Sequence, residues 1–531
     1  MKKYNKIKSI AAMLMVCIYA SSCTDNFDNL NIDQNTLTSN ELDPSFAGAS
    51  FLSALYAGTH NGSYSSQYGI DDQGTWGIAT GILSSQFVQY LNTGYSTDRN
   101  DLGTWSDRGW LRFYTVAVPA LNNAFKASEG NAEALAVLKL WKVFMYNQMT
   151  DYYGPIPYTE AGNREGTVAY DSQEVIYEDF FNLLDEADSV LSSTSESTVT
   201  LLALSDRVYG GDVEKWKTFG NSLRLRLALR ISDVQPDKAK TQAELAVANG
   251  VMESNDDSAT YKTSETTPNN LNMIVNSWGY DMTASMESIL KGYNDPRLAI
   301  WFSQTEDGEY RGKPAGGLEN EFETLKFSRF NINTFGNDLS DEKPIEILMA
   351  SECYLNRAEG ALNGWNMNGT AQNLYEEGIK LSLAQWGVTD QNTIADYIAE
   401  SSTPVAPQIT EETGFAPDVA ADIANLETPP VSVPVAWSAT EADQRTQITV
   451  QKYLALFPES WEAWADLRRT DKQVTYTLLH TDNVDGVGTG LINRVNYSSE
   501  EILTNNKAVE NAATKLGGPD NGNTKLWWDK N

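Results

Sequence analysis

The chain has 531 residues, 14 tryptophans, 25 tyrosines and a formal net charge of −32 at neutral pH. A chain of this length is long enough to bury one large core or two ordinary ones. Such strong negative charge repels phosphate backbones, so the composition argues against nucleic-acid binding. The acidity requires no cationic partner, because it also keeps a protein soluble at a crowded surface.

The first 22 residues have the layout of a secretory signal. Four lysines precede a short apolar stretch, and the small residues Ala20, Ser21 and Ser22 stand directly before Cys23. The apolar stretch is too short to remain in a bilayer as a spanning helix. Small residues before a cysteine are typical of bacterial lipoproteins, so we expect cleavage before Cys23 and a lipid on its thiol. The alternative is an ordinary signal peptide with an incidental cysteine.

Residues 23–44 are polar and rich in asparagine, which predicts a flexible tether without a core of its own. No later segment approaches the roughly 20 consecutive apolar residues that a spanning helix needs. The lipid on Cys23 is therefore expected to be the only membrane anchor.

Cysteine and histidine usage limits the chemistry of the mature chain. Of the three cysteines, Cys17 lies in the signal and Cys23 carries the lipid, which leaves Cys353 without a disulfide partner. His60 and His480 are the only imidazoles. We therefore expect no intrachain disulfide, no metal site and no cofactor.

Apolar residues recur with helical spacing in three early segments, residues 132–149, 175–191 and 216–231. In the third segment, leucines alternate with Arg224, Arg226 and Arg230. These arginines are predicted to pair with acids on neighbouring helices or to reach solvent along their stems. A basic helix for nucleic acid is the alternative, and the surrounding negative charge disfavours it.

Helical spacing returns near residue 345. Residues 351–365 and 370–386 predict a helical hairpin of the tetratricopeptide type, with the small residues Ala358, Ala361, Ala371 and Gly378 and the aromatic Tyr375 at the expected spacing. An unrelated helical hairpin is the alternative. Residues 448–469 are also expected to be helical, with Pro458 in the first turn of a new helix.

Two regions lack helical spacing. Residues 250–344 are rich in Asn, Thr, Ser, Gly and aromatic residues, and residues 401–436 are rich in Pro and Thr. This composition predicts long loops carried on the helical scaffold. Loops of such length are usually functional.

Several helical segments together carry a family resemblance. They are WKVFMYNQMTDYYGPIPY at 141–158, WKTFGNSLRLRLALRIS at 216–232, DPRL at 295–298, LMASECYLNRAEGALNGW at 348–365, QKYLALFPESWEAWADLRR at 451–469 and KLWWD at 525–529. In this order, behind a lipoprotein signal, they resemble the SusD/RagB nutrient-binding lipoproteins of Bacteroidetes. The acidic residues just after Cys23 also resemble the surface-export signals of such lipoproteins. The resemblance covers nearly the whole mature chain.

The resemblance implies a mostly α-helical protein in which tetratricopeptide-like hairpins form a scaffold. Residues 45–531 would form a single domain, with loop-rich insertions near 250–344 and 401–436. The protein would lie at the cell surface, anchored by its lipid to the outer membrane, as a lid on a SusC-type TonB-dependent transporter. It would bind nutrient glycans and catalyse no reaction. Peptides are the alternative cargo in this family.

For a neutral sugar, we expect aromatic side chains that stack on the ring, with polar groups at the rim. Aromatic residues without helical spacing form two clusters, Tyr64, Tyr68, Trp76, Tyr90, Tyr95 and Trp105 in the early region, and Trp278, Tyr280, Trp301 and Phe302 in the middle region. The residues predicted to contact ligand are Trp76, Tyr90, Tyr95, Trp105, Trp278, Tyr280 and Trp301. The helical tryptophans Trp141, Trp216, Trp365 and Trp461 are expected in the core.

Two other classes of function remain open at this stage. A glycosidase needs two carboxylates at a fixed separation, and 71 acidic residues do not exclude such a pair. No nucleophile elbow or zinc-protease motif is present, and the glycine-rich residues 486–490 lack the preceding strand that a phosphate loop requires. A helical-repeat scaffold that binds only proteins would have the same hairpins without aromatic residues in its loops.

Overall fold

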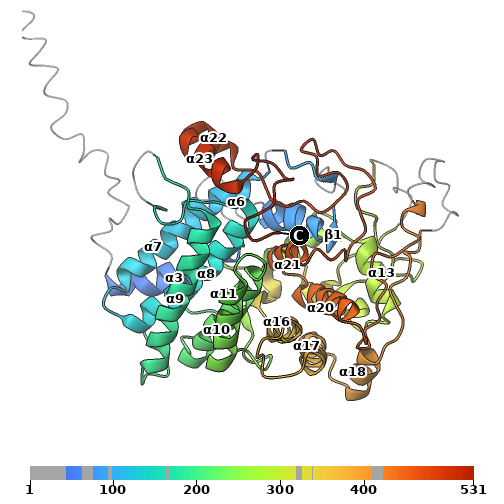
Figure 1. Cartoon of the computed structure of the whole chain (residues 1–531), viewed down its shortest axis with the longest axis horizontal. Helices are drawn as coiled ribbons and strands as arrows, with labels where there is room; N and C mark the ends of the chain where they lie inside the picture. Colours follow the sequence, from blue (N-terminus) through green and yellow to red (C-terminus); the bar gives the residue numbers. More distant parts are fainter. Residues whose placement is uncertain are drawn as a thin grey trace, which may run out of the picture.

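The computed structural model describes residues 43–62, 76–93, 99–103, 105–162, 167–318, 326–337, 339–409 and 423–530. Helices dominate the fold, as predicted, and the two small sheets have two strands each in this part of the chain. Helix α3 (Ala47–Gly58) and the helices from α7 (Val118–Ala127) to α11 (Pro236–Asn249) occupy one side of the molecule (Figure 1). Helices α16, α17, α20 and α21 form the centre and lower part, and the loop-rich segments lie beside and above them.

The first group of helices is built from helices that are neighbours in the sequence. Its elements are η1 (Pro44–Phe46), α3 (Ala47–Gly58), η2 (Gly77–Ser84), α5 (Ser85–Phe87), α6 (Asp107–Arg112), η4 (Phe113–Ala117), α7 (Val118–Ala127), α8 (Ala132–Tyr153), α9 (Gln173–Ser193), α10 (Val213–Arg230) and α11 (Pro236–Asn249). Helix α8 packs against α9, and α10 packs against α11. The side chains of Asn131, Ser172 and Asp212 accept backbone N–H groups at the starts of α8, α9 and α10. The three predicted helices are therefore confirmed, each a few residues longer than its periodic segment.

The middle of the chain contains short elements between its loops. They are β2 (Ala259–Tyr261), α12 (Asn270–Ser277), β3 (Asp281–Met282), α13 (Ala284–Gly292), α14 (Leu298–Trp301), α15 (Ile332–Phe335) and η5 (Leu339–Asp341). Strand β3 pairs with β1 (Leu91–Asn92), and β2 pairs with β4 (Ile345–Leu348), both antiparallel. The prediction of long loops over 250–344 is thus correct in outline, but short helices and two sheets fix those loops to the scaffold.

The predicted hairpin is formed by α16 (Ala350–Leu362) and α17 (Ala371–Gln385). Ala358 and Tyr375 are fully buried, and the Tyr375 ring packs against Trp437, with centroids 4.9 Å apart. A Cβ at Gly378 would lie 2.8 Å from Cγ of Leu355, so a glycine is needed for α17 to approach α16 this closely. The small residues therefore act as the sequence predicted.

The C-terminal elements are α18 (Gln391–Ile398), α20 (Glu441–Leu456), α21 (Ser460–Thr470), α22 (Ser499–Thr504) and α23 (Asn506–Leu516). The sequence predicted Pro458 in the first turn of a helix. In the structure, Pro458 lies one residue before the N-cap of α21, so this prediction is wrong by two positions or more. The N-cap is Glu459, whose carboxylate accepts the N–H groups of Trp461 and Glu462, both at 3.0 Å. The acidic N-cap thus satisfies two of the N–H groups that the start of a helix leaves free.

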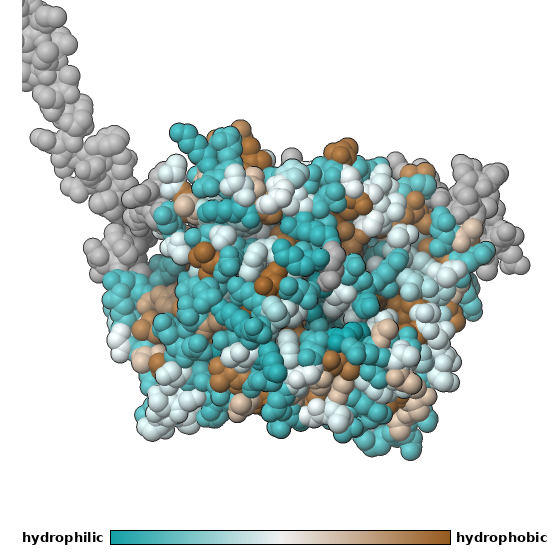
Figure 2. Space-filling view, in the orientation of Figure 1, coloured by the Kyte–Doolittle hydropathy of each residue, from teal (hydrophilic) through white to brown (hydrophobic). Residues whose placement is uncertain are grey.

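One continuous core of buried apolar residues extends from Ala47 to Trp528. Trp141, Trp216 and Trp461 belong to it, as expected, whereas Trp365 is only half-buried at the end of α16. Cys353 is a buried free thiol, and burial raises its pKa to about 12. The face shown in Figure 2 is mainly hydrophilic, with hydrophobic residues in small scattered groups.

The arginines of α10 are buried and paired with acids. Of the two alternatives that the sequence left open, pairing with acids is therefore confirmed. Arg224 contacts Asp185 on α9 at 2.6 Å, Arg226 contacts Glu352 on α16 at 2.6 Å, and Arg230 contacts Glu462 on α21 at 2.6 Å. A basic surface helix for nucleic acid is therefore excluded, because the guanidinium groups lie inside the protein.

Candidate functional site

The two aromatic clusters, far apart in the sequence, meet in the structure. Leu91 of β1 pairs with Met282 of β3, and Asn92 pairs with Asp281. The Tyr280 hydroxyl donates to the carbonyl of Gly77 at 3.3 Å, and its ring lies so close to Gly81 that a Cβ there would be 2.7 Å from the hydroxyl oxygen. The early and middle regions therefore form one surface around the β1–β3 sheet.

A half-exposed tryptophan lies at this junction. Trp278 packs edge-on against Tyr280, with ring centroids 6.2 Å apart, and the residue is partly buried against the core. Arg329 pairs with Asp281, Nε to Oδ1 at 3.0 Å, and the Arg329 side chain is 52% exposed. The guanidinium packs on Gly279, where a Cβ would come within 2.9 Å of Nη1. We call Trp278, Asp281 and Arg329 the Trp278 surface.

The Asp281 carboxylate is held in a mostly buried place. Burial raises its pKa, and the nearby charges of Arg329 and Lys313 partly offset this effect. The carboxylate is 14% exposed, so it is oriented by its arginine but remains within reach of a ligand. An aromatic ring with a fixed acceptor and an exposed donor beside it is the chemistry expected for a sugar.

Three predicted ligand residues are instead enclosed in the core, as is Phe302. Tyr90 is 1% exposed and its hydroxyl donates to the carbonyl of Tyr453 at 2.5 Å. Trp301 is fully buried between Phe457 and Trp386, and Tyr280 is fully buried under η2. These rings have no exposed face on which a sugar could stack in this conformation. The physical reason is that the middle region folds back on the scaffold, so aromatic residues without helical spacing also enter the core.

The remaining predicted residues differ in their surroundings. Trp76 is 6% exposed and borders a cavity of about 50 Å³ with His60 and Trp461, too small for a sugar ring. Trp105 is half-buried and packs on the core. Tyr95, Tyr64, Tyr68 and the lipidation candidate Cys23 lie outside the described residues.

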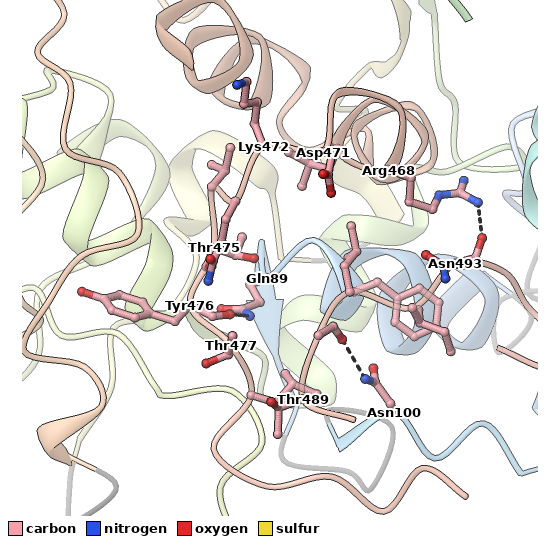
Figure 3. A pocket seen from close by; sticks show the side chains of 18 of the residues that line it. Gln89, Asn100, Arg468, Asp471, Lys472, Thr475, Tyr476, Thr477, Thr489 and Asn493 are labelled. Carbon is pink, nitrogen blue, oxygen red and sulfur yellow. Dashed lines mark hydrogen bonds between the residues drawn. The ribbon is translucent and has the colours of Figure 1, made fainter. Parts of the chain in front are cut away.

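A larger cavity of about 390 Å³ opens next to β1, which we call the central cavity (Figure 3). Its lining is dominated by amide and hydroxyl side chains with a few charges, including Gln86, Gln89, Asn100, Arg468, Asp471, Lys472, Gln473, Thr475, Thr477, Thr489, Asn493, Lys525 and Asp529. Tyr476 also borders it, but its ring points away from the other labelled side chains toward α13. No tryptophan lines this cavity.

Gln89 connects the central cavity to the β1–β3 sheet. Its backbone has a positive φ of 52°, and its amide group donates to the carbonyl of Tyr476 at 2.6 Å and accepts from the Ser285 hydroxyl at 2.6 Å. Its own carbonyl accepts from the Thr283 hydroxyl directly after β3. The side chain is thus fixed in position before any ligand arrives.

Arg468 supplies a buried cation in the cavity wall. It stacks on Trp464, with 3.7 Å between the guanidinium carbon and the ring centroid, and donates to three backbone carbonyls, including that of Asn493 at 2.6 Å. Burial lowers its pKa to about 9, so it remains charged at neutral pH. The cavity therefore combines neutral amide and hydroxyl groups with several charged side chains, of which Arg468 is held by three backbone carbonyls.

The lining of the central cavity contains no histidine, cysteine or serine. Among the described residues, no group of three or more His, Cys, Asp or Glu side chains is arranged to hold a metal ion. The glycine-rich residues 486–490 were interpreted from the sequence only as a loop. In the structure, this loop forms part of the wall of the central cavity, and the carbonyl of Gly490 accepts a hydrogen bond from the Asn100 side chain at 3.0 Å.

Helical hairpins that carry a loop-built polar surface define a ligand-binding protein of the helical-repeat class. Known proteins agree with that reading. The family described as SusD-like, SusD and RagB outer membrane lipoprotein, matches residues 29–529. A chitin-binding SusD homolog from Flavobacterium johnsoniae is 34% identical, with a TM-score of 0.80 over 91% of this chain and 99% of that chain.

Two further solved structures are similar. A SusD-like protein from Bacteroides thetaiotaomicron is 28% identical, with a TM-score of 0.78 over 91% of this chain and 99% of that chain. A structure named as a chitin-binding protein is 25% identical, with a TM-score of 0.73 over 91% of this chain and 100% of that chain. No curated protein sequence matches at a significant level.

The chain belongs to the SusD-like family of outer membrane lipoproteins. The family consists of non-catalytic binding proteins, which agrees with the prediction that the chain is not an enzyme. Across the helices that the structure describes, none is both long and apolar enough to span a membrane.

Proposed function

We propose that this protein binds glycans at the Trp278 surface and the adjoining central cavity, and delivers them to a SusC-type TonB-dependent transporter. The observation that carries the proposal is the half-exposed Trp278 ring with the Asp281–Arg329 pair directly beside it. Among the seven predicted ligand residues, Trp278 is partly exposed and lies in the same segment as Asp281, which pairs with Arg329. The delivery step rests on the family, whose members act as lids on such transporters.

The chemistry favours a neutral oligosaccharide. A tryptophan face contacts the apolar side of a pyranose, while Asp281 accepts from hydroxyl or amide N–H groups and Arg329 donates to ring or carbonyl oxygens. The central cavity, within the range of about 300–1,000 Å³ for small-molecule sites, would hold a neighbouring sugar through its amides and threonines. Two similar proteins are named as chitin-binding, so oligomers of N-acetylglucosamine are the first ligands to test.

Calorimetric titration of the detergent-solubilised protein with chitotetraose tests this assignment. Trp278→Ala removes an exposed stacking surface, so the affinity should fall about tenfold while the melting temperature stays nearly constant. Trp365→Ala is the matched control, because Trp365 is also half-buried but belongs to the α16–α17 hairpin. Equal affinity in the protein and its Trp278→Ala variant would remove the Trp278 surface from the site. Binding of oligopeptides in place of every glycan tested would change the cargo.

We also propose that Cys23 carries the lipid and that residues 23–44 form the tether between the lipid and the folded domain of residues 45–531. Small residues before Cys23 and the polar sequence after it support this assignment. Cys23→Ala should abolish labelling by a fatty-acid probe and release the protein from the membrane fraction. A tagged, lipidated protein extracted in mild detergent should bring the transporter with it. Recovery of the protein alone, from membranes that contain the transporter, would contradict the delivery role.

A further inference from the structure

Three residues form a closed ring of hydrogen bonds in the wall of the central cavity. The backbone N–H of Tyr476 donates to the Ser285 hydroxyl oxygen at 3.0 Å, and the Tyr476 carbonyl accepts from the Gln89 side-chain amide at 2.6 Å. The Ser285 hydroxyl donates to the Gln89 amide oxygen at 2.6 Å, which closes the ring. Two side chains thus bind both backbone polar groups of Tyr476, as a neighbouring β-strand would. We call Gln89, Ser285 and Tyr476 the Gln89 clamp.

The Gln89 clamp is enclosed, and its geometry is fixed from several sides. Gln89 is 3% exposed and Ser285 is 1% exposed. The backbone of Gln89 has a φ of 52°, which residues other than glycine rarely adopt, so its surroundings have to hold it there. The hydroxyl groups of Thr283 and Tyr453 both donate to the Gln89 carbonyl. Strained positions that are fixed in this way cluster at functional sites.

The clamp determines which side chains face the central cavity. The Tyr476 ring packs in a small separate cluster with Ile409 and Leu426, and it points away from the other labelled side chains of the cavity (Figure 3). The residues on either side of it, Thr475 and Thr477, line the cavity. Because the clamp fixes the backbone of Tyr476 between them, it also limits where both threonine hydroxyl groups lie.

The other end of the clamp joins the sheet of the Trp278 surface. Gln89 lies just before β1 and Ser285 just after β3. These two strands pair, and β3 carries Asp281 of the Trp278 surface. The clamp therefore connects the wall of the central cavity to the strand that carries Asp281. Two parts of a site that keep their separation bind one ligand more tightly than two parts that move, because less freedom is lost on binding.

We propose that Gln89 is a positioning residue of the glycan site. It holds the Tyr476 segment at a fixed place relative to Asp281, so that one ligand binds the central cavity and the Trp278 surface together. Both ends of the Gln89 amide bind protein groups, so Gln89 acts through its neighbours and not by contact with ligand. The inference rests on the proposed glycan site at these two places. It predicts that a long ligand depends on Gln89 more than a short one.

A second buried glutamine provides the matched control. Gln447 on α20 is 1% exposed. Its amide donates to the carbonyls of Pro434 and Ala436, at 2.8 and 2.7 Å, and accepts from the N–H of Ser438 at 3.0 Å. Gln447 thus fixes the backbone of a loop by the same chemistry as Gln89, but residues 434–438 do not line the central cavity. Its replacement shows what the loss of a merely structural clamp does.

Calorimetric titration of the detergent-solubilised full-length protein with chitotetraose and chitobiose tests the proposal. Gln89→Leu removes both side-chain hydrogen bonds and should lower the affinity for chitotetraose about fivefold. The shorter chitobiose is expected to occupy one part of the site at a time, so its affinity should stay nearly constant. Gln447→Leu should leave both affinities unchanged. Ser285→Ala is a milder change in the same clamp, so it should act in the same direction, and its combination with Gln89→Leu should add little.

Hydrogen–deuterium exchange of the ligand-free variants tests the clamp without any glycan. Exchange across residues 474–478 should quicken about fivefold in Gln89→Leu, because this segment then opens more easily. It should stay unchanged in Gln447→Leu. Unchanged exchange in Gln89→Leu overturns the proposal.

The binding results separate this proposal from the proposed function. If Trp278→Ala lowers the affinity for chitotetraose and Gln89→Leu does not, the positioning role of Gln89 is wrong and the glycan site remains. If neither variant lowers the affinity, both are wrong. Equal losses for chitotetraose and chitobiose in Gln89→Leu, or an equal loss in Gln447→Leu, would show a general loosening of the fold and overturn the positioning role.

Discussion

Two glutamates on neighbouring elements show how differently the scaffold and the walls of the cavities treat charge. Glu352, in the first turn of α16, is fully buried and binds Arg226 through both oxygens, at 2.8 and 2.6 Å. Glu346, on β4, borders two cavities and has no cation beside it among the described residues. Glu352 is paired inside the scaffold, whereas Glu346 borders cavities without an ionic partner among the described residues.

The pairing between the central helices forms a connected network, which we call the core charge network: Asp151, Arg226, Arg230, Glu352 and Glu462. Arg230 contacts Glu462 at 2.6 Å and Asp151 at 3.3 Å, and Asp151 also accepts from the indole N–H of Trp528 at 2.8 Å. Burial alone would lower the pKa of Arg226, but the adjacent carboxylates outweigh burial and raise it. The network links α8, α10, α16 and α21 to the C-terminal segment.

The largest effect is expected from breaking this network at Glu352. Glu352→Ala leaves Arg226 buried, with its next acid, Glu462, 3.7 Å away, and should destabilise the fold by about 3–5 kcal/mol. Glu441→Ala is a matched control, since Glu441 also lies in the first turn of a helix and pairs with an arginine, but is 64% exposed. Its loss should cost at most about 1 kcal/mol. Urea unfolding measures both, and equal losses would mean that the buried pair contributes no more than an exposed one.

Much of the scaffold could be predicted from the sequence, because the spacing of apolar and small residues within one segment is enough to predict a helix. Apolar spacing placed α8, α9 and α10, and small residues placed the α16–α17 hairpin. The arginines of α10 were expected either to pair with acids on neighbouring helices or to reach solvent, and the structure shows the pairing. Which acids they would meet was not predictable, since Arg226 and Glu352 come together only through the packing of distant helices.

The candidate site was predictable only in part, because it depends on contacts between distant segments. Loop composition pointed to Trp278, which the fold leaves partly exposed, but it also pointed to Tyr90 and Trp301, which the fold encloses. Exposure of a loop aromatic depends on whether another segment covers it, and local spacing does not encode that. The cavity amides Gln89 and Asn100 gave no sequence signal, because their roles arise from a backbone with positive φ and a loop near residue 490.

The smallest effect is expected at Glu346, and it depends on pH. Burial raises the pKa of Glu346 from about 4.5 to about 7, so the folded state disfavours the ionised form. Stability is therefore highest below the unfolded pKa and falls as pH rises from about 4.5 through about 7. Glu346→Gln removes this loss. Because the side chain is only half-buried, the variant should gain about 1 kcal/mol on the unmodified protein between pH 5 and pH 8.

Urea titrations of the Glu346→Gln variant and of the unmodified protein at both pH values measure this gain. Glu441→Gln is the control, because Glu441 is exposed and its pair with Arg445 should give only a small change in stability with pH. A constant difference between Glu346→Gln and the unmodified protein from pH 5 to pH 8 would mean that Glu346 is solvated or paired in solution. Glu346 would then no longer contrast with Glu352. If the gain is observed, the unpaired carboxylate is a real cost to the fold, because burial of a charge without a partner opposes folding.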